Sequence, residues 1–271
     1  MKKIRVAILD MHKGAANQGM RNIHELIERY GDEHNIEFSK TVFDIRGAQE
    51  IASLDFDIYF SSGGPGSPVE LEGWEPTYIE LFEKIRKHNK SSSQKKFVFL
   101  ICHSFQIICH HFKLANVCLR RKESFGVFQV HLTKHASKDA IFSLLPDPFF
   151  AVDSRKWQVI DPDDIALEKM GAKILGLEKS RPHVPLQRAV MAIRLTPEIL
   201  GTQFHPEADA KGMVFHLKTE ERKKFVQETY GQARYEDLLI HLNDPDKIML
   251  THQLIIPHFL SIALETLIHQ G

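Results

Sequence analysis

The sequence predicts an α/β protein with a doubly wound, mostly parallel sheet and a helical extension at its C-terminal end. Short apolar runs alternate with helix-like segments from residue 4 to about residue 110, which is the order of parallel βα units. Two of these runs lead into segments rich in small or reactive residues, at the strand ends where open α/β sheets bind ligands. Beyond about residue 219 the apolar pattern is helical only.

The first half of the chain supplies the parallel strands and their connecting helices. Strands are expected at residues 4–9, 36–44, 56–60 and 97–101. Helices are expected at residues 21–30, 49–54, 78–85 and 104–110. The loop at residues 10–20 is either a surface turn or part of a substrate or partner surface. Because the carboxyl ends of parallel strands share one edge, the segments after residues 60 and 101 are expected to be neighbours.

The second half of the chain is expected to add strands first and helices afterwards. Strands are expected at residues 126–132, 149–152, 172–177, 189–195 and 201–204. Helices are expected at residues 220–230, 235–242 and 247–269, with Pro257 kinking or breaking the last of them. No linker rich in Pro, Gly or Ser divides the chain. Residues 1–210 are therefore expected to form the α/β domain, with residues 211–271 packed on it as a helical extension.

The composition is that of a soluble globular chain, with 271 residues, 43% hydrophobic and 26% charged. Lys plus Arg and Asp plus Glu number 35 each, which argues against a nucleic-acid or anionic-membrane surface. The three cysteines are odd in number and close in sequence, so they are expected to be free thiols in a reducing cytoplasm. No secretory core and no apolar run of about eighteen residues is present, so neither secretion nor a membrane span is expected.

Cys102 is the most informative residue in the chain. It follows the apolar run 97–101, which is typical of a buried strand, and precedes the helix-like segment 104–110. A cysteine at this junction lies at the positive end of a helix, where the field favours thiolate over thiol. Cys102 is therefore a candidate nucleophile.

A second segment, at residues 201–207, can supply the base for that nucleophile. Pro206 biases His205 toward an extended backbone, and residues two apart in an extended chain face the same side. His205 and Glu207 can therefore lie together, with the carboxylate holding the imidazole. The combination predicts a nucleophile, a base and an orienting acid, which is the logic of covalent acyl transfer.

A third segment, at residues 61–68, contains three glycines and two prolines directly after a predicted strand. Glycine permits close approach of backbone and ligand, so such a loop can aim an amide N–H at a developing oxyanion. No Gly-Lys-Ser/Thr follows, so the loop is not a phosphate-binding P-loop.

The three segments together resemble the class I (triad) glutamine amidotransferases. That family carries a Ser-Gly-Gly-Pro-Gly-Ser-Pro-like loop, a Gly-x-Cys-x-Gly-x-Gln elbow and a Gln-Phe-His-Pro-Glu box, and this chain has counterparts at residues 62–68, 100–106 and 203–207. The resemblance covers roughly the first two hundred residues, and the chain also resembles the glutaminase part of GMP synthase. It implies a flavodoxin-like sheet with an antiparallel extension.

The resemblance also implies residue roles. Cys102 is expected to be the nucleophile, His205 the general base and acid, and Glu207 the orienting acid. The backbone N–H groups of Gly64 and His103 are expected to form the oxyanion hole. The expected substrate-binding residues are Gly66, Gln106, Ser154 and Trp157.

The implied reaction is release of ammonia from glutamine through a thioester on Cys102, without a cofactor. A separate ammonia-accepting synthetase subunit is a candidate partner, because no nucleotide-binding signature is present. A homo-oligomer is another open alternative.

Four positions depart from the family pattern. Leu100 and Ser104 replace elbow glycines, His103 directly follows the nucleophile, and Arg155 stands where histidine is common. These departures keep two other functions open: hydrolysis of γ-glutamyl conjugates or peptides, and a non-catalytic binding subunit that retains the fold.

The chain has sixteen histidines, but their spacing does not indicate a metal site. His131 and His135 have i, i+4 spacing but no evident third ligand, so no metal site is expected. Cys109 is expected to be core and Cys118 structural.

Overall fold

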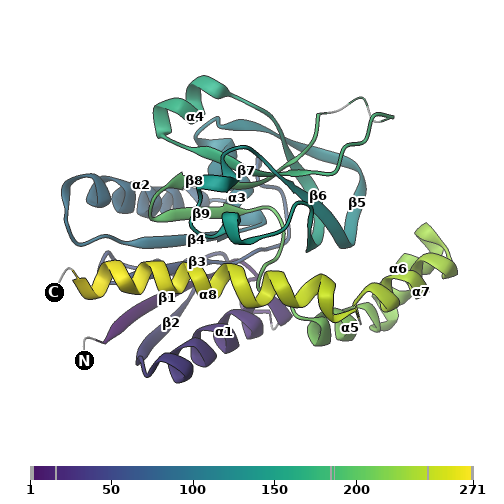
Figure 1. Cartoon of the computed structure of the whole chain (residues 1–271), viewed down its shortest axis with the longest axis horizontal. Helices are drawn as coiled ribbons and strands as arrows, with labels where there is room; N and C mark the ends of the chain where they lie inside the picture. Colours follow the sequence, from purple (N-terminus) through teal and green to yellow (C-terminus); the bar gives the residue numbers. More distant parts are fainter. Residues whose placement is uncertain (1–2, 16, 184, 186, 243, 270–271) are drawn as a thin grey trace.

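A nine-stranded sheet runs through the computed structural model, which describes residues 3–15, 17–183, 185, 187–242 and 244–269 (Figure 1). The sheet order is β2-β1-β3-β4-β9-β8-β7-β5-β6. The strands are β1 (Ile4–Asp10), β2 (Phe38–Asp44), β3 (Ile58–Ser61), β4 (Phe97–Ile101), β5 (Ala115–Leu132), β6 (Phe149–Pro162), β7 (Lys173–Glu178), β8 (Val190–Thr196) and β9 (Ile199–Thr202). The helices are α1 (Gln18–His34), α2 (Glu75–Ser91), α3 (His103–His111), α4 (Asp164–Met170), α5 (Ala210–Leu217), α6 (Glu220–Tyr230), α7 (Gln232–Leu242) and α8 (Pro245–His269).

The strands β2, β1, β3, β4 and β9 are parallel, which confirms the predicted doubly wound core. The register aligns Leu9 with Ser61, Ser61 with Leu100, and Ile101 with Thr202. The glycine-rich loop, Cys102 and the segment leading to His205 therefore leave the sheet at the same edge. This alignment brings three segments that are distant in sequence to one place.

Each face of the sheet is covered by helices, and the alternation of β1 shows the two layers. Ile4, Val6 and Ile8 belong to an apolar cluster with α1 and α8, whereas Ala7 and Leu9 belong to a cluster with α2, α3 and α4. Figure 1 shows α8 running along the sheet beside α1. A parallel strand is buried on both sides, which explains why these runs are continuously apolar.

The strands β8, β7, β5 and β6 pair antiparallel and extend the sheet at one side. β5 and β6 begin or end well beyond the predicted ranges, and their register shifts between Leu119 and Ser124. Charged residues inside these strands hide their extent from the sequence, and several of these charges, those of Arg120, Glu123 and Arg155 among them, are paired within the fold.

One sequence-based expectation is wrong, and one alternative of another is excluded. Residues 49–54 form irregular backbone that leads into a turn at Leu54 instead of a helix. Gln49 has a positive φ of 55°, and so short a helix is marginal without strong packing. Of the two outcomes expected at Pro257, a kink or a break, the break does not occur, because α8 continues through this residue. Its neighbours Ile256 and Phe259 are buried in the main core, and that packing outweighs the lost backbone hydrogen bond.

α8 is long and apolar enough, by length and composition, to span a membrane over Lys247–Ile268. Its apolar side is accounted for by packing, because Ile255, Leu260, Ala263 and Leu264 lie in the same cluster as β1 and α1. A core helix of a globular protein passes the same test of length and composition.

Candidate active site

Cys102 occupies the turn between β4 and α3 in a backbone conformation that side-chain-bearing residues rarely adopt. Its φ is 49° and its ψ is −96°, and its N–H donates to the Thr202 carbonyl at 2.8 Å. Such strain is found at nucleophile elbows, where a tight turn presents the reactive atom to a cavity. The first N–H groups of α3 point toward the same place and favour negative charge there.

The elbow accommodates both residues that replace the family's glycines. Leu100 is fully buried and aligns with Gly201 on β9, where a β-carbon would lie 2.6 Å from the Phe105 ring. The Ser104 hydroxyl lies 2.9 Å from the Ser61 carbonyl and accepts from the Ile101 N–H at 2.8 Å. Ser104 therefore links β3 to β4 across the turn, which a glycine cannot do.

His205 and Glu207 form the pair predicted from their spacing. His205 Nδ1 lies 2.7 Å from Glu207 Oε1, and because an ionised carboxylate only accepts, Nδ1 carries the proton. The N–H of His205 donates to the Val152 carbonyl at 2.8 Å, which fixes the backbone beside β6. The Nε2 atom is left with no hydrogen-bond partner of standard geometry within the described residues.

His205 also interacts with Cys102 across Gly63. A β-carbon added at Gly63 would lie 3.1 Å from His205 Cε1 and 3.7 Å from Cys102 Cβ, so both side chains contact this glycine. Burial opposes the charged imidazole, but the Glu207 carboxylate and Cys102 outweigh it and raise the pKa of His205 well above its ordinary value. The arrangement favours the protonated form of the His205 imidazole.

One cavity of about 610 Å³ is lined by all nine residues that the sequence predicts for the site. These residues are Gly64, Gly66, Cys102, His103, Gln106, Ser154, Trp157, His205 and Glu207. Their proximity is a property of the fold, while the individual roles stay predictions.

The glycine-rich loop is shaped by its contacts with the end of β1. A β-carbon at Gly64 would lie 2.8 Å from the Met11 carbonyl oxygen, so only glycine fits there. Ser62 accepts from the Met11 N–H at 3.0 Å and donates to the Gly63 carbonyl at 2.8 Å. These contacts place Gly64 at the cavity, together with His103, whose N–H begins α3 and has no preceding helical carbonyl.

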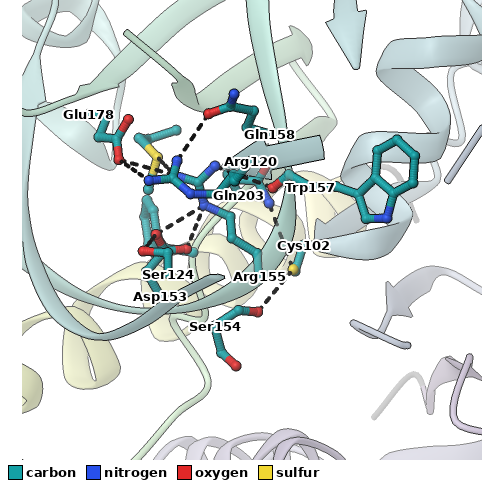
Figure 2. A network of polar contacts seen from close by, with 12 residues as sticks. Cys102, Arg120, Ser124, Asp153, Ser154, Arg155, Trp157, Gln158, Glu178 and Gln203 are labelled. Atoms are coloured by element: carbon teal, nitrogen blue, oxygen red, sulfur yellow. Dashed lines mark hydrogen bonds and ion pairs between the residues drawn. The ribbon is translucent and has the colours of Figure 1, made fainter. Parts of the chain in front are cut away.

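The predicted substrate stretch on β6 passes directly beside the nucleophile. The Ser154 carbonyl faces Cys102 Sγ at 3.8 Å, as Figure 2 shows. Gln106 Nε2 lies 3.3 Å from the Trp157 carbonyl and 3.2 Å from Gln203 Oε1. Gln203 Nε2 in turn lies 3.7 Å from Cys102 Sγ. The sulfur therefore contacts one backbone carbonyl, that of Ser154, and one side-chain amide, that of Gln203.

Behind this stretch lies a buried network of charges (Figure 2). Arg155 Nε contacts both oxygens of Asp153, at 2.8 and 2.9 Å, and Arg155 Nη1 donates to the Trp157 carbonyl at 3.3 Å. Ser124 donates to Asp153 at 2.7 Å, and Arg155 Nη2 lies 3.5 Å from Glu178. Arg155, at the position where the family has histidine, thus ties β5, β6 and β7 together beside the nucleophile.

The sequence did not single out several residues that line the cavity or contact the nucleophile. Gln203 lies two residues before His205, so the same alternation that paired His205 with Glu207 could have found it. Asn17, Gln18, Gly19 and Asn22 bring the end of the 10–20 loop and the start of α1 to the cavity. No helix was predicted at residues 210–217, so the sequence analysis did not identify the cavity residues on α5.

Within the described part of the chain, no group of three or more His, Cys, Asp or Glu side chains is placed to hold a metal. His131 lies 3.7 Å from Asp147, an ordinary ion-pair distance. Cys109 is fully buried, as expected for a core residue, and Cys118 is partly buried.

Comparisons with known proteins give one family. The model of the family described as glutamine amidotransferase class-I matches residues 19–218. A search of curated proteins found no match.

Solved structures with the same fold include two named as glutamine amidotransferases. The protein from Thermotoga maritima has a TM-score of 0.65 and 16% identity, covering 99% of both chains. That from Methylobacillus flagellatus has a TM-score of 0.60 and 13% identity, covering 100% of this chain and 95% of the other. The glutaminase domain of Trypanosoma brucei CTPS with bound acivicin has a TM-score of 0.58 and 14% identity, covering 97% and 94%.

Proposed function

The chain belongs to the class-I glutamine amidotransferase family, and on this basis we propose that it hydrolyses a γ-glutamyl amide through a thioester on Cys102. The observation that carries the proposal is the geometry of Cys102, His205 and Glu207. Cys102 sits on a strained elbow, and both Cys102 and the His205 imidazole contact Gly63. The Glu207 carboxylate lies 2.7 Å from Nδ1 of His205. Glutamine is the simplest substrate of this kind.

The first half of the reaction forms the thioester. The Cys102 thiolate adds to the side-chain carbonyl carbon, and the carbonyl oxygen becomes an oxyanion that accepts from the N–H groups of Gly64 and His103. His205 then gives the proton on Nε2 to the leaving amine, and the C–N bond breaks. Ammonia leaves when the substrate is glutamine.

The second half regenerates the enzyme. Neutral His205 removes a proton from water, and the resulting hydroxide attacks the thioester carbon. The C–S bond breaks, glutamate leaves, and the thiolate–imidazolium pair forms again. Glu207 keeps the Nδ1 tautomer throughout, so Nε2 is always the nitrogen that exchanges protons.

A synthetase-type acceptor for the ammonia is part of this proposal. The Trypanosoma brucei neighbour is named as a glutaminase domain of CTPS, which supports a partner of that kind. A retained fold without catalysis is the competing function, favoured by the departures at Leu100, His103 and Arg155.

The proposal is tested by measuring glutamate and ammonia release from glutamine and from γ-glutamyl amides. Wild-type protein should release glutamate, and Cys102→Ala should abolish the release. Cys118→Ala is the matched control, because Cys118 lies outside the cavity lining and should leave turnover unchanged. Absence of Cys102-dependent release from every γ-glutamyl compound would favour the non-catalytic function.

A further inference from the structure

The cavity at Cys102 continues well beyond the space that a free amino acid fills. Its volume of about 610 Å³ falls in the range of sites for drug-sized ligands, roughly 300–1000 Å³. Part of the lining comes from β5 and α5. The residues there are Phe125, Met213, Phe215 and His216. The further inference concerns this part of the lining, the α5 wall.

The α5 wall is attached to the catalytic segment itself. Only Ala208 and Asp209 separate Glu207 from α5, so the helix begins where the candidate triad ends. Asp209 caps α5 by accepting from the Gly212 N–H at 2.7 Å, and it accepts from Arg21 of α1 at 2.8 Å. These bonds brace the wall against α1.

The wall is aromatic and has no unpaired charge. The Arg222 guanidinium lies 3.8 Å above the centre of the Phe125 ring, and it pairs with Glu123 at 2.6 Å. The His216 ring lies 5.8 Å from the Phe125 ring, and burial followed by the Arg222 charge lowers the pKa of His216, which keeps it neutral. The wall therefore suits an uncharged, apolar group.

Phe215 completes the wall at the cavity mouth. Its side chain is 64% exposed, although it belongs to the lining. A large aromatic side chain left in water at the rim of a polar site gains free energy when an apolar group covers it. Ammonia, the leaving group of glutamine, is too small to make that contact.

We propose that the α5 wall is a subsite for the leaving amine, and that the preferred substrates are γ-glutamyl amides of amines bearing an aromatic or large aliphatic group. This inference rests on the proposed function and names the substrate class of the same site. The bond broken is the same C–N bond, the leaving amine takes its proton from His205 Nε2, and water supplies the hydroxyl of glutamate.

The test compares glutamine, γ-glutamyl-methylamide and γ-glutamyl-benzylamide with the full-length chain. The value of kcat/KM should be about tenfold or more higher for the benzylamide than for the methylamide, the effect of burying one ring. Phe215→Ser should remove most of this preference. Ile240→Ser is the matched control, because Ile240 is 68% exposed on α7 outside the cavity lining, and it should keep the preference.

The outcomes separate this inference from the proposed function. Cys102-dependent turnover without preference for the benzylamide overturns the inference and leaves the function standing, and it is the result expected of a mouth built to receive a protein partner. An unchanged preference in Phe215→Ser also overturns the inference. If no compound is turned over, calorimetry with Cys102→Ala decides: equal affinity for benzylamide and methylamide rejects the subsite, and tighter benzylamide binding that Phe215→Ser weakens supports it.

Discussion

His252 of α8 donates from Nδ1 to the backbone carbonyl of Glu207 at 3.1 Å. The carbonyl can only accept, and burial, followed by the charge of Arg29, lowers the pKa of His252, so the ring is a neutral Nδ1–H donor. The family match ends at residue 218, yet this contact links the C-terminal helix to the orienting acid of the candidate triad. The extension therefore takes part in placing Glu207.

Removing this donor should affect catalysis more than binding. In His252→Ala, loss of one hydrogen bond allows Glu207 to shift, and kcat should fall about 2- to 10-fold with little change in KM. His252→Gln keeps an N–H donor and should recover much of the loss. His258→Ala, an exposed histidine on the same helix, is the control. Equal effects of the Ala and Gln variants would show that the donor is unimportant.

Replacing Glu207 by Gln should change both rate and titration. The neutral amide no longer fixes the Nδ1–H tautomer, so kcat should fall by about 10²- to 10⁴-fold. The pKa of His205 should also fall, because the carboxylate that opposes its desolvation is gone. Histidine-selective NMR titration, with His205→Asn used to identify the signal, measures the shift. An unmoved pKa would contradict the assigned pairing.

The raised pKa of His205 has a consequence for stability against pH. Protonation is favoured in the folded state, so this contribution is complete below about pH 6.5 and is lost as the pH rises through the raised value. The free energy of unfolding of wild type relative to Glu207→Gln should therefore be largest near pH 6 and shrink at alkaline pH. Urea denaturation at several pH values tests this, and a difference that grows with pH would refute it.

The lowered pKa of His103 predicts the opposite dependence at acid pH, where the free energy of unfolding should fall. Burial, and then the charge of Arg46, hold the pKa of His103 at about 4, so the folded state disfavours its protonated form. The resulting contribution to the free energy of unfolding is present above about pH 6.5 and is lost as the pH falls toward 4. Its upper limit is about 3 kcal/mol. His103→Phe should flatten that acid dependence in denaturant unfolding. His110→Ala, exposed on the same helix, should keep it.

The charge network beside the nucleophile should respond strongly to loss of Arg155. Asp153 is buried, so Arg155→Ala leaves its carboxylate without its cation and should lower the free energy of unfolding by about 3–5 kcal/mol. Arg120→Ala is the comparison. Glu178, the partner of Arg120, still pairs with Arg155 and Arg181 in this variant. The free energy of unfolding should therefore fall by only about 1–2 kcal/mol. Similar losses in the two variants would mean that Asp153 does not depend on Arg155.

The sequence determined the parallel core and the residues at its edge. Continuous apolar runs identify strands buried on both faces, and motifs at their ends mark the ligand side, since parallel strands end together. The pairing of His205 with Glu207 followed from Pro206 and the two-residue period of an extended chain. The division into residues 1–210 and 211–271 stays a prediction.

Only the tertiary structure decided what depends on contacts between distant segments. The meeting of Cys102 and His205 needs β4 and β9 to be neighbours, and that pairing joins residues about a hundred positions apart. The same holds for Arg155 with Glu178, for His252 with Glu207, and for the α5 wall beside the cavity. Local periodicity carries no information on such pairs, because they form only when the sheet order and the packing of α5 and α8 are fixed by burial of the whole core.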